Sequence, residues 1–222
     1  MKNNQEYKNA ALEALKGRWP NAVVCTILFM LIALGTGLVL EFIDVESLPV
    51  GAMLLLLAGI FVLSVFVLYP LEVGYYNTFR KLYEEGNAEM THNMFNGGFS
   101  NVVHNAGGML LMDLFIALWS LLLFVPGLVK AFSYAMTPYI LQDFPELSAN
   151  QAIDRSRAMM KGHKFDLFYL YLSFIGWGLL CILTLGIGFF WLMPYMYTAS
   201  AAFYQDLKAE YESKTINNKI IQ

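Results

Sequence analysis

Long uncharged stretches dominate the pattern of polar and apolar positions along this chain. The longest runs from Leu167 to Gln205 and contains no Asp, Glu, Lys or Arg. A helix needs about 20 apolar residues, each rising ~1.5 Å, to cross the ~30 Å hydrocarbon core of a bilayer. This stretch is therefore long enough for two crossings, and Gly186-Ile187-Gly188 near its midpoint predicts the turn between them.

The same criterion predicts four further crossings. Trp19 to Leu40 and Ser47 to Leu71 are uncharged, and a third run ends at Pro126-Gly127. The predicted spans cover about residues 20–40, 50–71, 109–125, 128–142, 166–185 and 188–205. We therefore predict an all-α membrane protein, a single domain over residues 1–222, whose six transmembrane helices form three helical hairpins.

Short amphipathic or polar segments accompany these spans. Residues 1–18 are predicted as an interfacial helix, since an apolar face recurs at helical spacing; it lies either on an anionic membrane surface or as an ordinary cytoplasmic helix end. Residues 86–108 are polar and predict a loop with a short interfacial piece. Residues 148–161 predict a polar helix that a capping box of Ser148 and Gln151 opens. Residues 206–222 form a charged tail.

The distribution of basic residues decides between five and six spans, because it is not obvious whether residues 126–142 fully span or re-enter. With six spans, thirteen of the fourteen basic residues lie on the inside, as the positive-inside rule requires. They are Lys2, Lys8, Lys16, Arg18, Arg80, Lys81, Arg155, Arg157, Lys161, Lys164, Lys208, Lys214 and Lys219. The count predicts six spans with both termini in the cytoplasm.

Composition and charge narrow the class of protein. The chain is 58% hydrophobic and 14% charged, whereas soluble domains average about 45–50% and about 25%. Its net charge of −3 argues against a nucleic-acid partner, because no basic face is available to neutralise phosphates. Cys25 and Cys181 are expected at different membrane depths, too far apart for a disulfide, and are predicted to be packing residues.

No motif of catalytic chemistry is present. The three histidines have no partner at metal-ligand spacing, and the P-loop, the nucleophile elbow and the dinucleotide glycine pattern do not occur. The sequence therefore predicts no catalytic residue, no metal site and no cofactor.

Ionisable residues within the spans are the remaining candidates for a site. Asp113 lies in the third predicted span, where it either faces a polar path in the bundle interior or sits shallow and reaches interfacial water. Lys130 is close to the outer turn, where its side chain can reach the interface. With Tyr134 and Pro138 on the same returning segment, these residues are the predicted ligand site or polar path.

Several segments resemble a bacterial family of multi-pass membrane proteins catalogued as a domain of unknown function (number nine hundred and seventy-five). They are Ala14-Leu15-Lys16-Gly17-Arg18-Trp19, Ser133-Tyr134-Ala135-Met136-Thr137-Pro138-Tyr139-Ile140-Leu141, Met159-Met160-Lys161-Gly162-His163-Lys164, Leu172-Ser173-Phe174-Ile175-Gly176-Trp177, Thr184-Leu185-Gly186-Ile187-Gly188 and Pro194-Tyr195. The resemblance is specific from about residue 126 to 204 and poor over residues 41–105. It implies a location in the bacterial cytoplasmic (inner) membrane, and it implies no reaction.

Two hypotheses follow for the function. In the first, the protein is non-enzymatic and binds or passes a small amphiphile or peptide between its hairpins, within the lipid bilayer. In the second, it is a membrane-embedded scaffold that docks a protein partner through the helix at residues 148–161. A lipid-modifying enzyme is a more distant alternative. A polar cleft lined by Asp113 favours the first hypothesis, and an exposed apolar stripe on the cytoplasmic helix favours the second.

Overall fold

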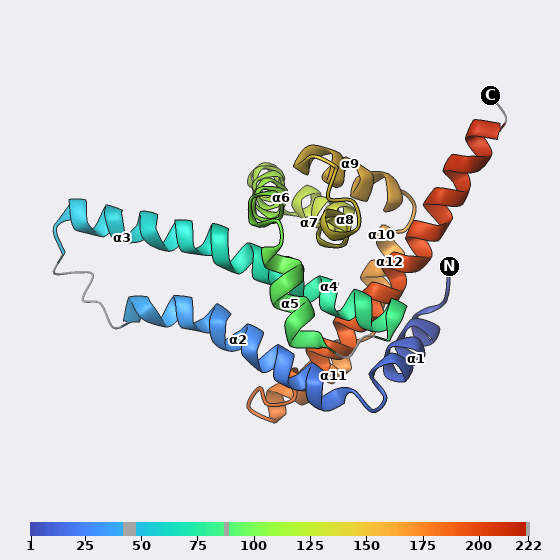
Figure 1. The fold of residues 1–222 in the computed structure, drawn as a ribbon, viewed down its shortest axis with the longest axis horizontal. Coiled ribbons are helices and arrows are strands. Elements are labelled where there is room, and N and C mark those ends of the chain that lie inside the picture. Colours follow the sequence, from blue (N-terminus) through green and yellow to red (C-terminus); the bar gives the residue numbers. More distant parts are fainter. Residues whose placement is uncertain (42–47, 87–88, 221–222) are drawn as a thin grey trace.

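The computed structural model describes residues 1–41, 48–86 and 89–220, and every regular element in them is a helix. In chain order these are α1 (Asn4–Leu15), α2 (Trp19–Glu41), α3 (Val50–Leu63), the π-helical turn η2 (Ser64–Leu68), α4 (Tyr69–Glu85), α5 (Met90–Phe99), α6 (Val102–Leu122), α7 (Phe124–Tyr134), α8 (Thr137–Asp143), α9 (Ala149–Met159), α10 (Lys164–Leu172), α11 (Ile175–Leu183) and α12 (Phe189–Ile220). The predicted all-α class is confirmed. Figure 1 shows the α2–α3 arm extending away from the body that the other helices form.

Three helical segments are long and apolar enough to cross a membrane: Val50–Glu85, Val102–Leu122 and Lys164–Leu183. The bent pair of α1 and the described part of α2 as far as Gly35, with an angle of 98° between them, makes a fourth candidate. The chain thus has the helices of a membrane protein. By length and composition the described helices give three or four crossings, so the count of six stays a prediction.

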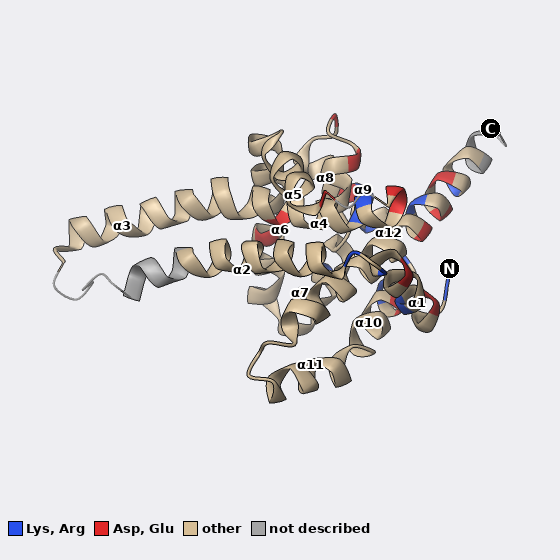
Figure 2. Ribbon diagram, turned by 60° about the horizontal axis from the view of Figure 1, so that its bottom comes forward, with Lys and Arg blue, Asp and Glu red and all other residues tan. Residues whose placement is uncertain are grey.

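The candidate spans run in different directions. In Figure 1, α3 lies in the plane of the view, whereas α6 is seen along its axis. None of the residues of α3 is buried within the protein, because α3 belongs to the projecting arm. The α2–α3 arm is also free of Lys and Arg, which gather around the ends of α4, α9 and α12 (Figure 2).

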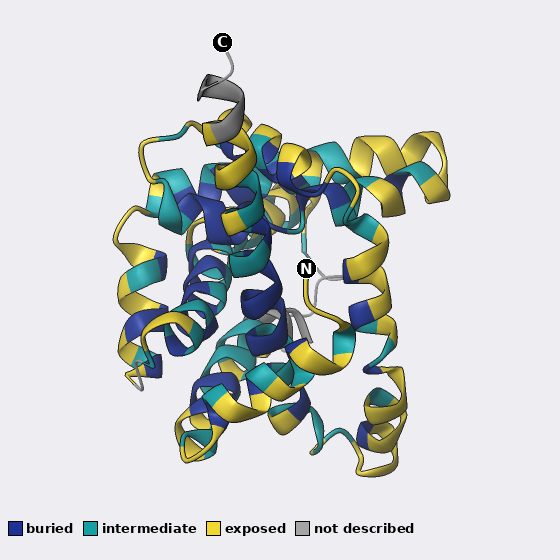
Figure 3. Ribbon diagram, turned by 90° about the vertical axis from the view of Figure 1, so that its right-hand side faces the viewer, coloured by how far each residue is buried: buried dark blue, intermediate teal, exposed yellow. Residues whose placement is uncertain are grey.

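The helix α12 runs through the middle of the body and combines the predicted last span with the predicted tail in one helix of 32 residues. Its small residues Ala199, Ala201 and Ala202 are fully buried, which lets neighbouring helices approach closely. Figure 3 shows this buried interior surrounded by exposed residues on the outer helices. The apolar face of α1 packs on α12, with the rings of Tyr7 and Phe203 5.4 Å apart. The apolar face predicted for this helix thus contacts protein, and its place relative to a membrane stays a prediction.

A charged cluster ties α4, α8 and α12 together. The carboxylate of Asp143, whose side chain is 5% exposed, pairs with the guanidinium of Arg80 and accepts from Lys208 Nζ at 2.8 Å. It also accepts a hydrogen bond of 2.7 Å from the hydroxyl of Tyr204. One carboxylate at the end of a short helix thus satisfies donors from two long ones.

Glycines allow the closest helix contact in the fold. A Cβ atom on Gly74 of α4 would overlap the carbonyl oxygen of Met94. A Cβ atom on Gly98 of α5 would overlap the carbonyl oxygen of Pro70. The predicted loop over residues 86–108 is wrong where the structure has helices. Met90–Phe99 form α5, and α6 already begins at Val102.

The third and fourth predicted spans also differ from the structure at their junction. The helix break falls at Leu123, whose backbone is extended, and not at Pro126-Gly127. Pro126 instead lies in the first turn of α7, where proline removes no helical hydrogen bond. The segment 128–142 is divided between α7 and α8, so neither helix alone is long enough to cross a bilayer.

Other local predictions are confirmed. Ser148 and Gln151 form the capping box that opens α9. Gly186 has φ of +89° in the turn before α12, a conformation that glycine adopts without steric cost. Cys25 and Cys181 are both free and buried.

Candidate functional site

Asp113 is held at the contact between α6 and α4. The hydroxyl of Tyr69 donates a hydrogen bond of 2.8 Å to Oδ2 of Asp113. Tyr69 directly follows the π-helical turn η2, which changes the register of the helix and hence the side chains that α4 presents to α6. Asp113 is partly buried, so this donor offsets some of the cost of removing the carboxylate from water.

A second carboxylate lies beside Asp113. Glu72 is three residues after Tyr69 and therefore on the same face of α4, close enough to Asp113 for the two charges to interact. Two neighbouring carboxylates repel each other when both are ionised, so a shared proton or a cationic group stabilises the pair. Glu72 was not predicted from the sequence, because it follows the predicted span 50–71. The helical spacing of Tyr69, Glu72 and Tyr76 is the signal that points to Glu72.

A cavity of about 270 Å³ lies between α4, α6, α7, α8 and α10, and Asp113 and Glu72 are not among its lining residues. It is lined by Tyr76, Met112, Ile116, Leu128, Ala131, Phe132, Ala135, Pro138 and Tyr171. Met112 precedes Asp113 in α6, and Tyr76 is one helical turn after Glu72 in α4. The arrangement offers an apolar chamber with two phenol groups in its wall and two carboxylates at its side.

The predicted site residues separate into two groups. Pro138 lines the cavity, and Asp113 lies beside it. Lys130 instead lies with its Nζ atom 4.3 Å from the ring of Trp119 and 5.8 Å from that of Tyr134. Trp119 and Asp113 are six residues apart in α6, and so about 120° apart around the helix.

Lys130 and Tyr134 are therefore brought together, but they do not join Asp113 within the part of the chain that the structure describes. The cation of Lys130 is attracted by two aromatic faces, a contact worth about 0.5–2 kcal/mol that needs no anionic partner. A single polar path through all four residues is not formed.

Among the described residues, no group of three or more His, Cys, Asp or Glu side chains is placed to hold a metal ion. An apolar group fits the cavity, and a cationic or hydrogen-bond-donating group fits the carboxylates of Asp113 and Glu72.

Comparison with known proteins gives one match. Residues 102–211, from the start of α6 into α12, match the model of a family described as a protein of unknown function (DUF975). This is the family that the sequence motifs resemble. The matched segment contains all four predicted site residues but not Tyr69, Glu72 or Tyr76. No curated protein and no solved structure matches the chain.

Proposed function

We propose that this chain, which matches the DUF975 family model over residues 102–211, is a non-enzymatic membrane protein that binds a small amphiphile or peptide. The ligand occupies the cavity lined by Pro138 and turns its polar end to Asp113 and Glu72. The observation that carries the proposal is an apolar cavity whose lining residues Met112 and Tyr76 lie in the same helices as Asp113 and Glu72, within about one turn of each carboxylate.

The chemistry of the two parts defines the class of ligand. Apolar side chains and the small residues Ala131 and Ala135 leave room for an aliphatic or aromatic group. Two carboxylates with one phenol donor between them favour a ligand with an amine or another hydrogen-bond donor. At about 270 Å³, the cavity is slightly smaller than the ~300–1,000 Å³ of typical ligand pockets, which argues for a small ligand or for one end of a longer one.

The membrane placement belongs to the same proposal. The chain lies in the bacterial cytoplasmic membrane with six crossings and with both termini in the cytoplasm. In support, thirteen of the fourteen basic residues fall in segments that this topology puts inside.

The scaffold hypothesis has less support. It needs an apolar stripe on α9 that is free for a partner, but Ala152, Ile153 and Met159 are buried against the body of the protein. The exposed face of α9 carries polar residues such as Gln151 and Asp154. The amphiphile is therefore the preferred ligand, and a lipid-modifying enzyme is an alternative that product analysis of extracted lipids would reveal.

Native mass spectrometry of gently extracted full-length protein tests this function. We expect a small bound molecule, lost in Ala135→Leu, which fills the cavity, and weakened in Asp113→Asn and Glu72→Gln. Glu146→Gln, which changes an exposed carboxylate away from the cavity, is the matched control and should retain it. A co-purifying protein in place of a small molecule, or adducts that survive Ala135→Leu, would contradict the proposal.

A further inference from the structure

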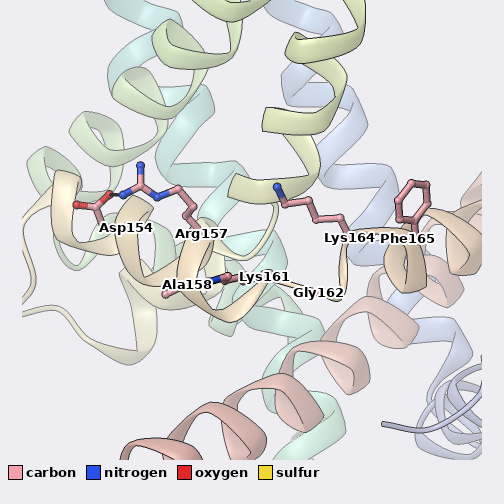
Figure 4. A pocket seen from close by; sticks show the side chains of 7 residues that line it. All are labelled: Asp154, Arg157, Ala158, Lys161, Gly162, Lys164 and Phe165. Carbon is pink, nitrogen blue, oxygen red and sulfur yellow. Dashed lines mark ion pairs between the residues drawn. The ribbon is translucent and has the colours of Figure 1, made fainter.

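A second, separate pocket of about 520 Å³ lies where α9 ends and α10 begins. It is lined by Asp154, Arg157, Ala158, Lys161, Gly162, Lys164 and Phe165. In Figure 4, Arg157 projects from α9, and Lys164 reaches across from the start of α10. Arg157 is paired with Asp154 at 3.0 Å, which leaves the two lysines as the uncompensated charges.

Neither Lys161 nor Lys164 has an ion-pair partner within the described ranges of the chain. With Arg157 and Asp154 included, the pocket carries a net charge of +2. Two ammonium groups without ion-pair partners line the same pocket, which favours binding of an anion. Phosphate is an anion that lysines commonly bind in proteins.

An apolar groove of about 270 Å³ adjoins the basic pocket and shares Lys164 and Phe165 with it. Its other walls are Val125, Leu128, Val129, Phe132 and Phe168, from α7 and α10. Phe165 is 72% exposed and Val125 66% exposed on the isolated chain. Lys164 thus has its aliphatic stem beside the groove and its charge in the basic pocket, which is how lysines lie at a membrane interface.

We propose that the basic pocket and the groove together bind one anionic phospholipid. The phosphate contacts Lys161 and Lys164, and an acyl chain lies along the groove between α7 and α10. The pairing of a cationic hollow with an apolar groove matches a lipid with a negative headgroup and fits a free phosphate less well, since a free phosphate leaves the groove empty. A zwitterionic choline lipid brings its own cation against the lysines and is disfavoured. The inference rests on the membrane location but not on the cavity at Pro138.

Asp154 is a restraining group in this site. Its carboxylate neutralises Arg157, so the guanidinium is not fully available to a phosphate. Replacing Asp154 by asparagine raises the net charge of the pocket by one and releases Arg157. Tighter binding of an anionic lipid is the expected consequence, and a purely structural role of the lysines does not predict it.

The test titrates the purified full-length protein with phosphatidylglycerol, with phosphatidylcholine of identical chains, and with glycerol phosphate, and follows binding by native mass spectrometry. Phosphatidylglycerol should bind more tightly than either alternative. The double variant Lys161→Gln/Lys164→Gln should weaken phosphatidylglycerol binding about 25-fold, at about fivefold for each lysine. Lys16→Gln/Lys214→Gln, which removes two exposed charges outside the pocket, is the matched control and should bind as the parent does.

Two further variants separate the headgroup from the chain. Val129→Trp fills the groove and should weaken phosphatidylglycerol binding without changing the weak binding of glycerol phosphate. Asp154→Asn should strengthen phosphatidylglycerol binding severalfold. Equal binding of the two lipids, no effect of the double lysine variant, or glycerol phosphate binding as tightly as the lipid would overturn the proposal. Loss of the adduct in Ala135→Leu with unchanged phosphatidylglycerol binding would show that the two sites are independent.

Discussion

At Asp113, one hydrogen bond decides how a carboxylate is tolerated among leucines. A charge near the centre of a membrane helix costs about 2.5–3.5 kcal/mol on insertion scales, and neighbouring leucines offset this in part. The donor from Tyr69 supplies a polar partner that the sequence of α6 does not contain. The carboxylate of Asp113 therefore has a hydrogen-bond donor from α4.

Tyr69→Phe should lower the free energy of unfolding by about 1.5–3 kcal/mol, because the partly buried carboxylate loses a hydrogen bond to a charged group. Thermal unfolding in detergent measures the change. In Asp113→Leu the same tyrosine substitution should cost much less, since no carboxylate is left to satisfy. Equal costs in the two backgrounds would show that the hydrogen bond contributes nothing to stability.

Gly74→Ala should destabilise the protein by at least about 2 kcal/mol, because the added methyl group overlaps the backbone of α5 and the helices must separate. Melting temperature and yield of folded protein measure the effect. Gly59→Ala is the matched control in α3, where nothing lies within 4 Å of the new atom. It should be neutral or raise the melting temperature slightly, as alanine favours the helix over glycine; a loss as large as that of Gly74→Ala would contradict the close packing of α4 on α5.

At the scale of elements, the ends of α4, α8 and α12 are joined by polar contacts in addition to apolar packing. Asp143 lies in the last turn of a seven-residue helix, too short to be stable by itself. Its contacts with Arg80, Tyr204 and Lys208 fix α8, and the first turn of the same helix contains Pro138, which lines the cavity. The charged cluster thus positions one wall of the site.

Asp143→Asn should lower the free energy of unfolding by about 1–3 kcal/mol, because Arg80 and Lys208 both lose their ion pair with a nearly buried carboxylate, although Arg80 keeps its pair with Glu84. Urea or thermal unfolding measures the change. Asp154→Asn, which breaks an exposed pair on α9, should cost less than about 1 kcal/mol. Similar small losses in both variants would show that the cluster is not a structural tie.

At the scale of the whole molecule, charge and apolar surface are segregated. In the α2–α3 arm, α3 and the part of α2 up to residue 35 expose apolar side chains, and most charged residues lie on α1, α9, the end of α4 and the second half of α12 (Figure 2). This segregation is the three-dimensional counterpart of the positive-inside pattern and gives the topology a direct test.

Single cysteines at positions 44 and 150, in a background lacking Cys25 and Cys181, should label differently with an impermeant thiol reagent on intact cells. Asp44→Cys should label, because the topology puts the α2–α3 connection outside. Asn150→Cys should label after the membrane is permeabilised, because α9 is cytoplasmic. Labelling of position 150 but not of position 44 would invert the proposed orientation.

Local features of this fold were readable from neighbouring residues. The apolar runs predicted membrane helices, Ser148 and Gln151 predicted the start of α9, and Gly186 predicted a turn, because each depends on residues within a few positions of one another. The helical face of α1 was also predicted. The contact of α1 with α12 was not predicted, because the helical spacing of apolar residues does not distinguish a face that packs on protein from one that lies on lipid.

Contacts between distant segments needed the tertiary structure. The sequence by itself determined a chain of helices apolar enough to cross a membrane and proposed Asp113, Lys130, Tyr134 and Pro138 as its site candidates, because hydrophobicity and helix-breaking residues act locally. Only the fold brought Tyr69 of α4 to Asp113, separated Lys130 from that group, and placed Lys164 beside a groove on α7. These associations depend on how the helices cross, and crossing is decided by packing between residues that lie far apart in the chain.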